Sequence, residues 1–258
     1  MNFILSEFSQ GLKHSLNYYS TVQTMLKIKE AHKPMFYSFF LTGIIFLGSL
    51  FIYNLLSELI LKNSPKLERT FFRLFYLFWL IPVYIFCFIL NIFCYSDIAS
   101  ATFKLIKGKP VSAALSFSRG LACEIHRGLI MGVYILLMTL LSFVPYSDPV
   151  ILCLMSWLYS FYCFEYRWVF EGKTIVREIK TIESNAVYYL GFGMPFALIT
   201  YSFPGFIGNG IWALVFPVFT VTAILADPPS APSQSLPIFR LVHRMCDKLE
   251  VLIFNKNV

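Results

Sequence analysis

The chain has 258 residues, of which 57% are hydrophobic and only 14% are charged, and its mean hydropathy is +0.67. A soluble domain carries roughly twice that charged share, so the composition excludes an ordinary water-soluble domain and predicts an all-α integral membrane protein. The net charge of +7 suits the topological and lipid-facing use of Lys and Arg. The longest basic cluster, KLIKGK at 104–109, is too thin for a nucleic-acid site, so no nucleic-acid partner is expected.

The cysteines and the N-terminal residues argue against two further classes of protein: disulfide-linked or metal-binding proteins, and secreted proteins with a cleaved leader. The six cysteines form no CxxC pair and show no metal-ligand spacing, so neither disulfides nor a metal site is expected. Charged residues precede the first long apolar run, and no small-residue cleavage site follows it. The apolar segment near Met35 is therefore expected to act as an uncleaved signal-anchor rather than as a secretory leader.

Residues 1–34 are predicted to form an amphipathic N-terminal helix. Apolar residues recur every three or four positions and make one stripe: Ile4, Phe8, Leu12, Leu16, Tyr19, Val22 and Leu26. Lys13, Lys27 and Lys29 occupy other faces. This spacing predicts a helix that lies along the membrane surface or packs beneath the bundle.

Residues 35–226 form the predicted membrane domain. Its apolar segments lie at about 35–57, 74–96, 129–146, 150–164, 186–203 and 209–226. The first two are free of charge and long enough to cross a bilayer, which predicts two long transmembrane helices, the second kinked at Pro82.

The segments 129–146 and 150–164 are each about 15 to 18 residues long, short of the roughly 20 that a span needs, whereas the charge-free run 186–226 is about 41 residues long, roughly twice one span. The four later segments form two pairs, separated by SDP at 147–149 and by SFPGFIGNG at 202–210, which are turn signals. Two short helical hairpins are therefore predicted, and two alternatives stay open: the hairpins cross the bilayer, or they re-enter on the same side. Amphipathic surface helices are expected at 169–185 and, after the Pro-rich linker that opens residues 227–258, at 237–254.

The distribution of Lys and Arg predicts the topology. Neither hairpin turn contains Lys or Arg, whereas the segments on the opposite side do. The loop at 58–73 carries Lys and Arg and departs from this pattern. We expect both termini to face the cytosol.

Charged residues appear abruptly in WLYSFYCFEYRW at 157–168. Glu165 and Arg167 could serve a buried path, or they could mark where a helix leaves the membrane, with Trp168 and its neighbours in an interfacial aromatic belt. They do not face one another on a helix, although Arg167 can reach Glu171. A second hypothesis closes the open end of the hairpin by pairing Glu165 with Arg127, or Arg167 with Glu124.

The other polar and glycine positions favour structural roles. Asp97 is predicted to end the second long helix where it leaves the lipid. GFGMP at 191–195 contains Gly191 and Gly193 in an apolar run, which indicates helix packing rather than phosphate binding. No nucleophile–base pair or paired carboxylate is apparent, so neither catalysis nor a cofactor is expected.

Several stretches resemble a known family. LYSFYCFEYRW (158–168), IESNAVYYLGFGMPFALIT (182–200), ALVFPVFTVTA (213–223) and IPVYIFCFILNIFCYSDIASATFKLIKGKP (81–110) are similar to the etoposide-induced protein 2.4 family, which shares a domain with the bacterial CysZ sulfate permeases. The resemblance implies a CysZ-like fold, with two long transmembrane helices and hairpins that penetrate the bilayer partly. It also implies an endoplasmic reticulum protein needed for autophagosome maturation and cargo degradation, and linked in animals to apoptosis.

Two functions follow as alternatives. The first is a non-enzymatic autophagy factor that contacts membrane lipids and proteins of the autophagy machinery. The second is a small-anion permease. Whether the protein forms homo-oligomers stays open.

Vertebrate members of the family carry a basic insertion associated with importin binding, where this chain has only KIKEAHKP at 27–34. Importin binding is therefore not expected.

Overall fold

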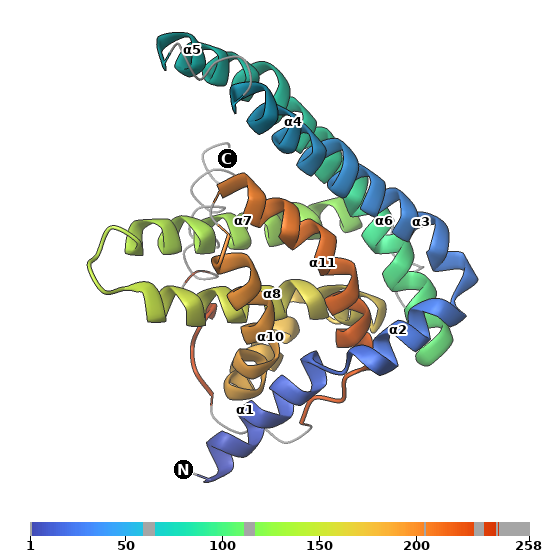
Figure 1. Ribbon diagram of the computed structural model, residues 1–258. Helices are drawn as coiled ribbons and strands as arrows, with labels where there is room; N and C mark the ends of the chain where they lie inside the picture. The colour runs from blue at the N-terminus through green and yellow to red at the C-terminus, as the bar shows by residue number, and fades with distance from the viewer. Residues whose placement is uncertain are drawn as a thin grey trace, which may run out of the picture.

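The computed structural model describes residues 2–58, 65–110, 117–203, 205–229, 235–240 and 242, and this part of the chain is helical, without a strand. Two long arms lie side by side, and the remaining helices pack into a bundle against one end of them (Figure 1). Within the described residues, three helices are long and apolar enough to cross a membrane: Lys29–Leu55, Thr70–Ile106 and Ile207–Leu225. The predicted all-α membrane fold is confirmed.

Each arm is one long helix with a π-helical stretch inside it. The first arm consists of α3 (Lys29–Phe39), η1 (Phe40–Leu47) and α4 (Gly48–Leu56), and the second of α5 (Pro65–Phe75), η3 (Tyr76–Leu80) and α6 (Ile81–Ile106). At 1.5 Å per residue the two apolar helices extend about 40 and about 56 Å, whereas the hydrocarbon core of a bilayer is about 30 Å thick. Both arms can therefore cross it, and the second reaches well beyond.

Two residues of the second arm, Pro82 and Asp97, were singled out in the sequence. Pro82 lies in the first turn of α6, directly after the π-helical η3. A π-helical turn is wider than an α-helical one. It accommodates Pro82 because proline has no backbone N–H to donate and its ring crowds the preceding turn. The prediction that Asp97 ends the helix is wrong, because α6 continues to Ile106. An exposed carboxylate on one face does not interrupt the backbone hydrogen bonds of a helix.

The N-terminal region forms two helices instead of one, α1 (Asn2–Ser15) and α2 (Tyr18–Lys27). They separate at Asn17, whose side chain caps α2 by accepting from the backbone N–H of Ser20 at 3.4 Å. Because α1 packs against α10 (Ala186–Tyr201), it belongs to the bundle. This contact fits the packed placement, one of the two that the sequence predicted.

The bundle contains two helical hairpins, joined by the short amphipathic helix α9 (Ile175–Ser184). Their helices are α7 (Phe117–Leu141), α8 (Asp148–Phe170), α10 (Ala186–Tyr201) and α11 (Gly205–Leu225). The helices α7 and α8 are longer than the apolar segments 129–146 and 150–164, because both continue through charged residues. In contrast, α10 extends only about 24 Å, less than the hydrocarbon thickness.

Aromatic side chains form the centre of the bundle. The fully buried residues Phe161 and Phe164 of α8, Phe192 and Phe196 of α10, and Phe219 of α11 belong to one cluster. Phe196 and Phe219 stack with ring centroids 4.7 Å apart. Burying such rings supplies much of the packing free energy and fixes the relative positions of the three helices.

Candidate functional site

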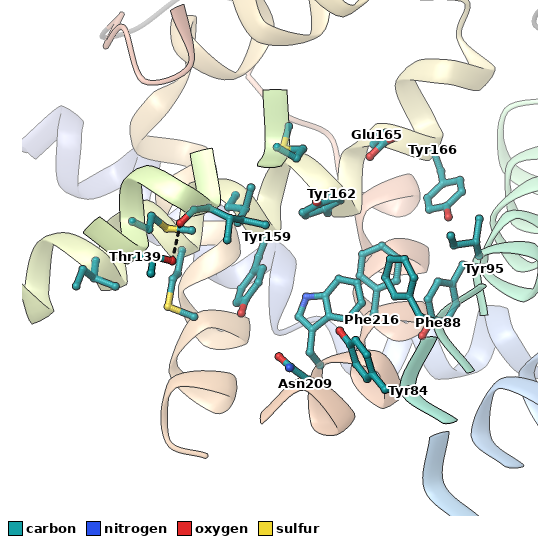
Figure 2. A pocket seen from close by; sticks show the side chains of 18 of the residues that line it. Tyr84, Phe88, Tyr95, Thr139, Tyr159, Tyr162, Glu165, Tyr166, Asn209 and Phe216 are labelled. Atoms are coloured by element: carbon teal, nitrogen blue, oxygen red, sulfur yellow. Dashed lines mark hydrogen bonds between the residues drawn. The ribbon is translucent and has the colours of Figure 1, made fainter. Parts of the chain in front are cut away.

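A cavity of about 750 Å³ opens between α6, α7, α8 and α11 (Figure 2). This volume lies within the usual range for ligand pockets, roughly 300–1,000 Å³. Aromatic, methionine and branched aliphatic side chains dominate the lining, which also includes Glu165: Tyr84, Phe88, Ile92, Tyr95, Met131, Ile135, Met138, Thr139, Ser142, Ile151, Met155, Leu158, Tyr159, Tyr162, Glu165, Tyr166, Asn209, Trp212 and Phe216. This cavity is the candidate site.

Glu165 and Arg167 lie on different sides of α8. Glu165 lines the cavity, at the same end as Tyr162 and Tyr166, while Asn209 and Tyr84 lie toward the other end (Figure 2). The side chains of Glu124 and Arg127 lie outside the described residues, so their pairing with Arg167 and Glu165 stays a prediction. Sequence reasoning singled out Glu165, but it did not identify the cavity that this residue lines.

Arg167 binds the end of α11. Its guanidinium donates to the backbone carbonyl of Ala223 at 3.2 Å and to that of Ala226. Its Nε donates to Oε1 of Glu171 at 2.9 Å, the contact one helical turn away that the spacing allowed. A cation at the C-terminus of a helix satisfies carbonyls that have no partner within the helix and complements its dipole. Arg167 therefore fixes α11 against α8.

The ion pair with Arg167 lowers the pKa of the carboxyl group of Glu171. Burial alone would raise the pKa of Glu171, but hydrogen bonds and charge from Arg167 and Lys173 outweigh it and hold the pKa below its ordinary value of 4.5. A lowered folded-state pKa contributes stability above the unfolded pKa, and this stability is lost as the pH falls through the folded pKa.

We therefore expect Arg167→Met to raise the pKa of Glu171 and to lower the free energy of unfolding by about 2 kcal/mol at neutral pH, because hydrogen bonds to charged groups are lost. Thermal unfolding in detergent, from neutral pH to below the ordinary pKa of Glu171, measures both effects. The wild type should lose more stability than the variant over this acid range. Arg167→Lys is the matched control, since it keeps the charge without the planar fork. Equal acid sensitivity of wild type and Arg167→Met would contradict the assignment.

Trp168 lies in the core and not in an interfacial aromatic belt. Its side chain is 1% exposed, and its ring packs against Phe161 and Phe164 with centroids 5.7 Å from each. Trp157 is partly buried and donates to the carbonyl of Ala186 at 2.8 Å. The aromatic side chains of this block therefore hold helices together, because their face of α8 turns into the bundle.

Gly191 and Gly193 allow three helices to approach closely. A methyl group on Gly193 would overlap the carbonyl oxygen of Ser156 in α8, and one on Gly191 would overlap the carbonyl oxygen of Phe8 in α1. Gly11 of α1 meets the backbone of Tyr188 in the same way. The helix α10 thus lies between α1 and α8 with its backbone against both. Asp97, in contrast, lies exposed on α6 and is not among the described residues that line the cavity.

Sequence reasoning did not predict the role of Glu183, a buried carboxylate on α9 that holds the segment at 239–240 and is called the carboxylate clamp below. Oε1 of Glu183 accepts from the backbone N–H groups of Phe239 and Arg240, at 3.0 and 2.8 Å, and Oε2 accepts from the guanidinium of Arg240 at 3.1 Å. A sequence signal existed: Ile175, Glu178, Ile179, Ile182 and Glu183 follow helical spacing, which places both glutamates on the apolar face. Among the described residues no group of three His, Cys, Asp or Glu side chains could hold a metal ion.

Comparisons with known proteins identify relatives over most of the chain. The family model described as "Sulfate transporter CysZ/Etoposide-induced protein 2.4" matches residues 16–207. A "Protein EI24 homolog" of Dictyostelium discoideum is 31% identical over 89% of this chain and 78% of the relative, and one of Arabidopsis thaliana is 24% identical over 87% and 84%.

A third relative is more limited in extent. "Ectopic P granules protein 4" of Caenorhabditis elegans is 33% identical over 61% of this chain and 51% of its own length. No solved structure matches the chain significantly. Since the family model covers most of the chain, and the Dictyostelium relative extends over nearly all of it, the chain belongs to the sulfate transporter CysZ/etoposide-induced protein 2.4 family.

Proposed function

We propose that this protein is a non-enzymatic, multi-pass membrane protein of the endoplasmic reticulum, required for autophagosome maturation and cargo degradation. Family membership supports the proposal, because the resemblance to the eukaryotic branch of the family implies a role in autophagy. The name of the nematode relative supports it, since granules in the wrong place are what failed clearance would leave. Membrane lipids and proteins of the autophagy machinery are the proposed partners, with both termini in the cytosol.

A small-anion permease is the second candidate, favoured by the CysZ part of the family description. The charge of the cavity counts against an anion path there. Glu165 lines it, and no Lys, Arg or His is among the lining residues that the structure describes. A carboxylate repels sulfate in a site of low dielectric constant. We therefore place the permease second.

Clearance of an autophagic cargo in cells that lack the protein tests the proposal. We expect the cargo and the lipidated autophagosome marker to accumulate, and the wild-type gene to restore clearance. Normal clearance without the protein would overturn the autophagy assignment. Sulfate flux in liposomes that contain the purified protein tests the permease separately, because conduction there requires no autophagy machinery.

A further inference from the structure

A much smaller cavity lies where the three candidate spans of the described residues meet. Its volume is about 20 Å³. Each span contributes one polar side chain to the lining: Thr42 from Lys29–Leu55, Asn91 from Thr70–Ile106 and Asn209 from Ile207–Leu225. Tyr95 and Asn209 line both this cavity and the larger one, so the two cavities adjoin (Figure 2).

The amide of Asn91 has a polar atom that needs a partner. The side chain is 2% exposed, and its Nδ2 donates to Oγ1 of Thr42 at 2.8 Å. Its Oδ1 is buried, and no group among the described residues donates to it. Turning the amide over would let Oδ1 accept from Thr42 and would leave Nδ2 without an acceptor. One atom of the amide therefore lacks a protein partner in either orientation.

The depth of Asn91 makes an unpaired atom costly. Asn91 lies in the charge-free stretch 74–96, about 27 Å along the helix from Arg73 and about 9 Å from Asp97. This position lies within the hydrocarbon layer, where bulk water does not reach a polar group. Leaving the atom unpaired costs as much free energy as a lost hydrogen bond, whereas immobilising one ordered water usually costs less.

The size and the polar lining of the cavity suit one water molecule. A cavity of about 10–15 Å³ or more can hold a water, provided that two to four polar groups bind it. The volume of about 20 Å³ satisfies the first condition for one water and excludes a lipid chain or a larger solute. Asn91, Thr42 and Asn209 supply the polar groups, together with the hydroxyl of Tyr95, which donates to the carbonyl of Ala213 at 2.7 Å and still has a lone pair to offer.

We propose that this small cavity binds one water molecule that links the three spans. The water bonds to the amide atom of Asn91 that Thr42 does not engage, and it joins this atom to Asn209 across the cavity. Lipid provides no hydrophobic force between helices, so polar contacts of this kind help to hold membrane helices together. This site depends on the membrane location of the protein and not on its role in autophagy, so the two proposals stand or fall separately.

Brief X-ray irradiation of the full-length protein, in nanodiscs equilibrated with heavy-oxygen water, tests the site. X-rays split water into hydroxyl radicals, which oxidise the side chains nearest to a bound water. Cys87 is 3% exposed and lines the small cavity. Cys163 is fully buried in the aromatic core and is not among the described residues that line either cavity. We expect mass spectrometry of the peptides to find heavy oxygen on Cys87 and none on Cys163.

Three variants connect the label on Cys87 to the proposed water. Asn91→Leu removes the amide and should abolish the label, whereas Asn54→Leu, which removes an exposed amide of the first arm outside the lining, should leave it unchanged. Thr42→Ile replaces the hydroxyl by a bulkier apolar group in the cavity and should also abolish the label, so it carries the test if Asn91→Leu fails to fold. An unlabelled Cys87 in the wild type, equal labels on Cys87 and Cys163, or an unchanged label in either folded cavity variant would each overturn the proposal.

Discussion

Replacing Gly193 by alanine is expected to lower the free energy of unfolding by about 3 kcal/mol or more, the upper part of the range for overpacking. The new methyl group would overlap the carbonyl oxygen of Ser156 and lie 2.7 Å from Oγ of Ser160. A backbone carbonyl within a helix cannot rotate away, so α8 and α10 must separate. Thermal and chemical unfolding of the purified protein in detergent measure this loss.

The separation would also weaken the contacts around Gly193. Oγ of Ser160 donates to the carbonyl of Tyr189 at 2.5 Å, and Phe164 packs edge-on against Phe192 with centroids 4.8 Å apart. Both contacts join α8 to α10, so moving the helices apart lengthens them together. The loss of stability should therefore exceed the cost of the methyl group alone.

Gly132→Ala is the matched control for this prediction. Gly132 is exposed within α7, and a methyl group there meets nothing within 4 Å. Alanine costs less conformational entropy than glycine in a helix, so Gly132→Ala should stabilise the protein by about 0.5 kcal/mol or leave it unchanged. If Gly193→Ala proves as stable as Gly132→Ala, the inference that the backbones of α8 and α10 are in direct contact at Gly193 is wrong.

The sequence predicted the features of the fold that depend on local composition. Charge-free runs of sufficient length predicted the long arms, and Pro, Gly and Asn at 202–210 predicted the turn of the second hairpin, where α10 ends at Tyr201 and α11 begins at Gly205. These signals depend on neighbouring residues only. In contrast, no local signal stops α6 at Asp97, because a single charged residue is compatible with helical geometry.

The roles of the polar residues could not be predicted in the same way, because they depend on distant partners. Arg167 was visible as a charge in an apolar block, but the carbonyls that it binds belong to Ala223 and Ala226 of another helix. Similarly, the cavity exists only because four helices meet, and its lining residues are spread from Tyr84 to Phe216. Helical periodicity identifies which face of one helix is buried, and it does not identify what that face contacts.

Truncation of Glu183 is expected to have the second large effect, a loss of about 3 kcal/mol in Glu183→Ala. The side chain of Glu183 is 2% exposed, and its Oε1 accepts from the backbone N–H groups of Phe239 and Arg240. A buried donor that loses its acceptor costs about 1–3 kcal/mol. Phe239 is itself fully buried and stacks on Tyr134 with centroids 4.7 Å apart, so release of this segment would also uncover part of the aromatic core.

Two measurements and one control separate the clamp from a general loss of stability. Limited proteolysis should cleave Glu183→Ala within 235–240 under conditions that leave the wild type intact, and thermal unfolding should give the stability loss. Glu183→Gln keeps a carbonyl oxygen for the two N–H groups and loses only the charge pair with Arg240, whose side chain is 52% exposed. Because the Arg240 end of this ion pair is exposed to solvent, we expect the pair to contribute about 1 kcal/mol or less, so Glu183→Gln should resist cleavage and lose little stability. Equal cleavage of the alanine and glutamine variants would mean that charge, and not backbone hydrogen bonding, holds this segment against α9.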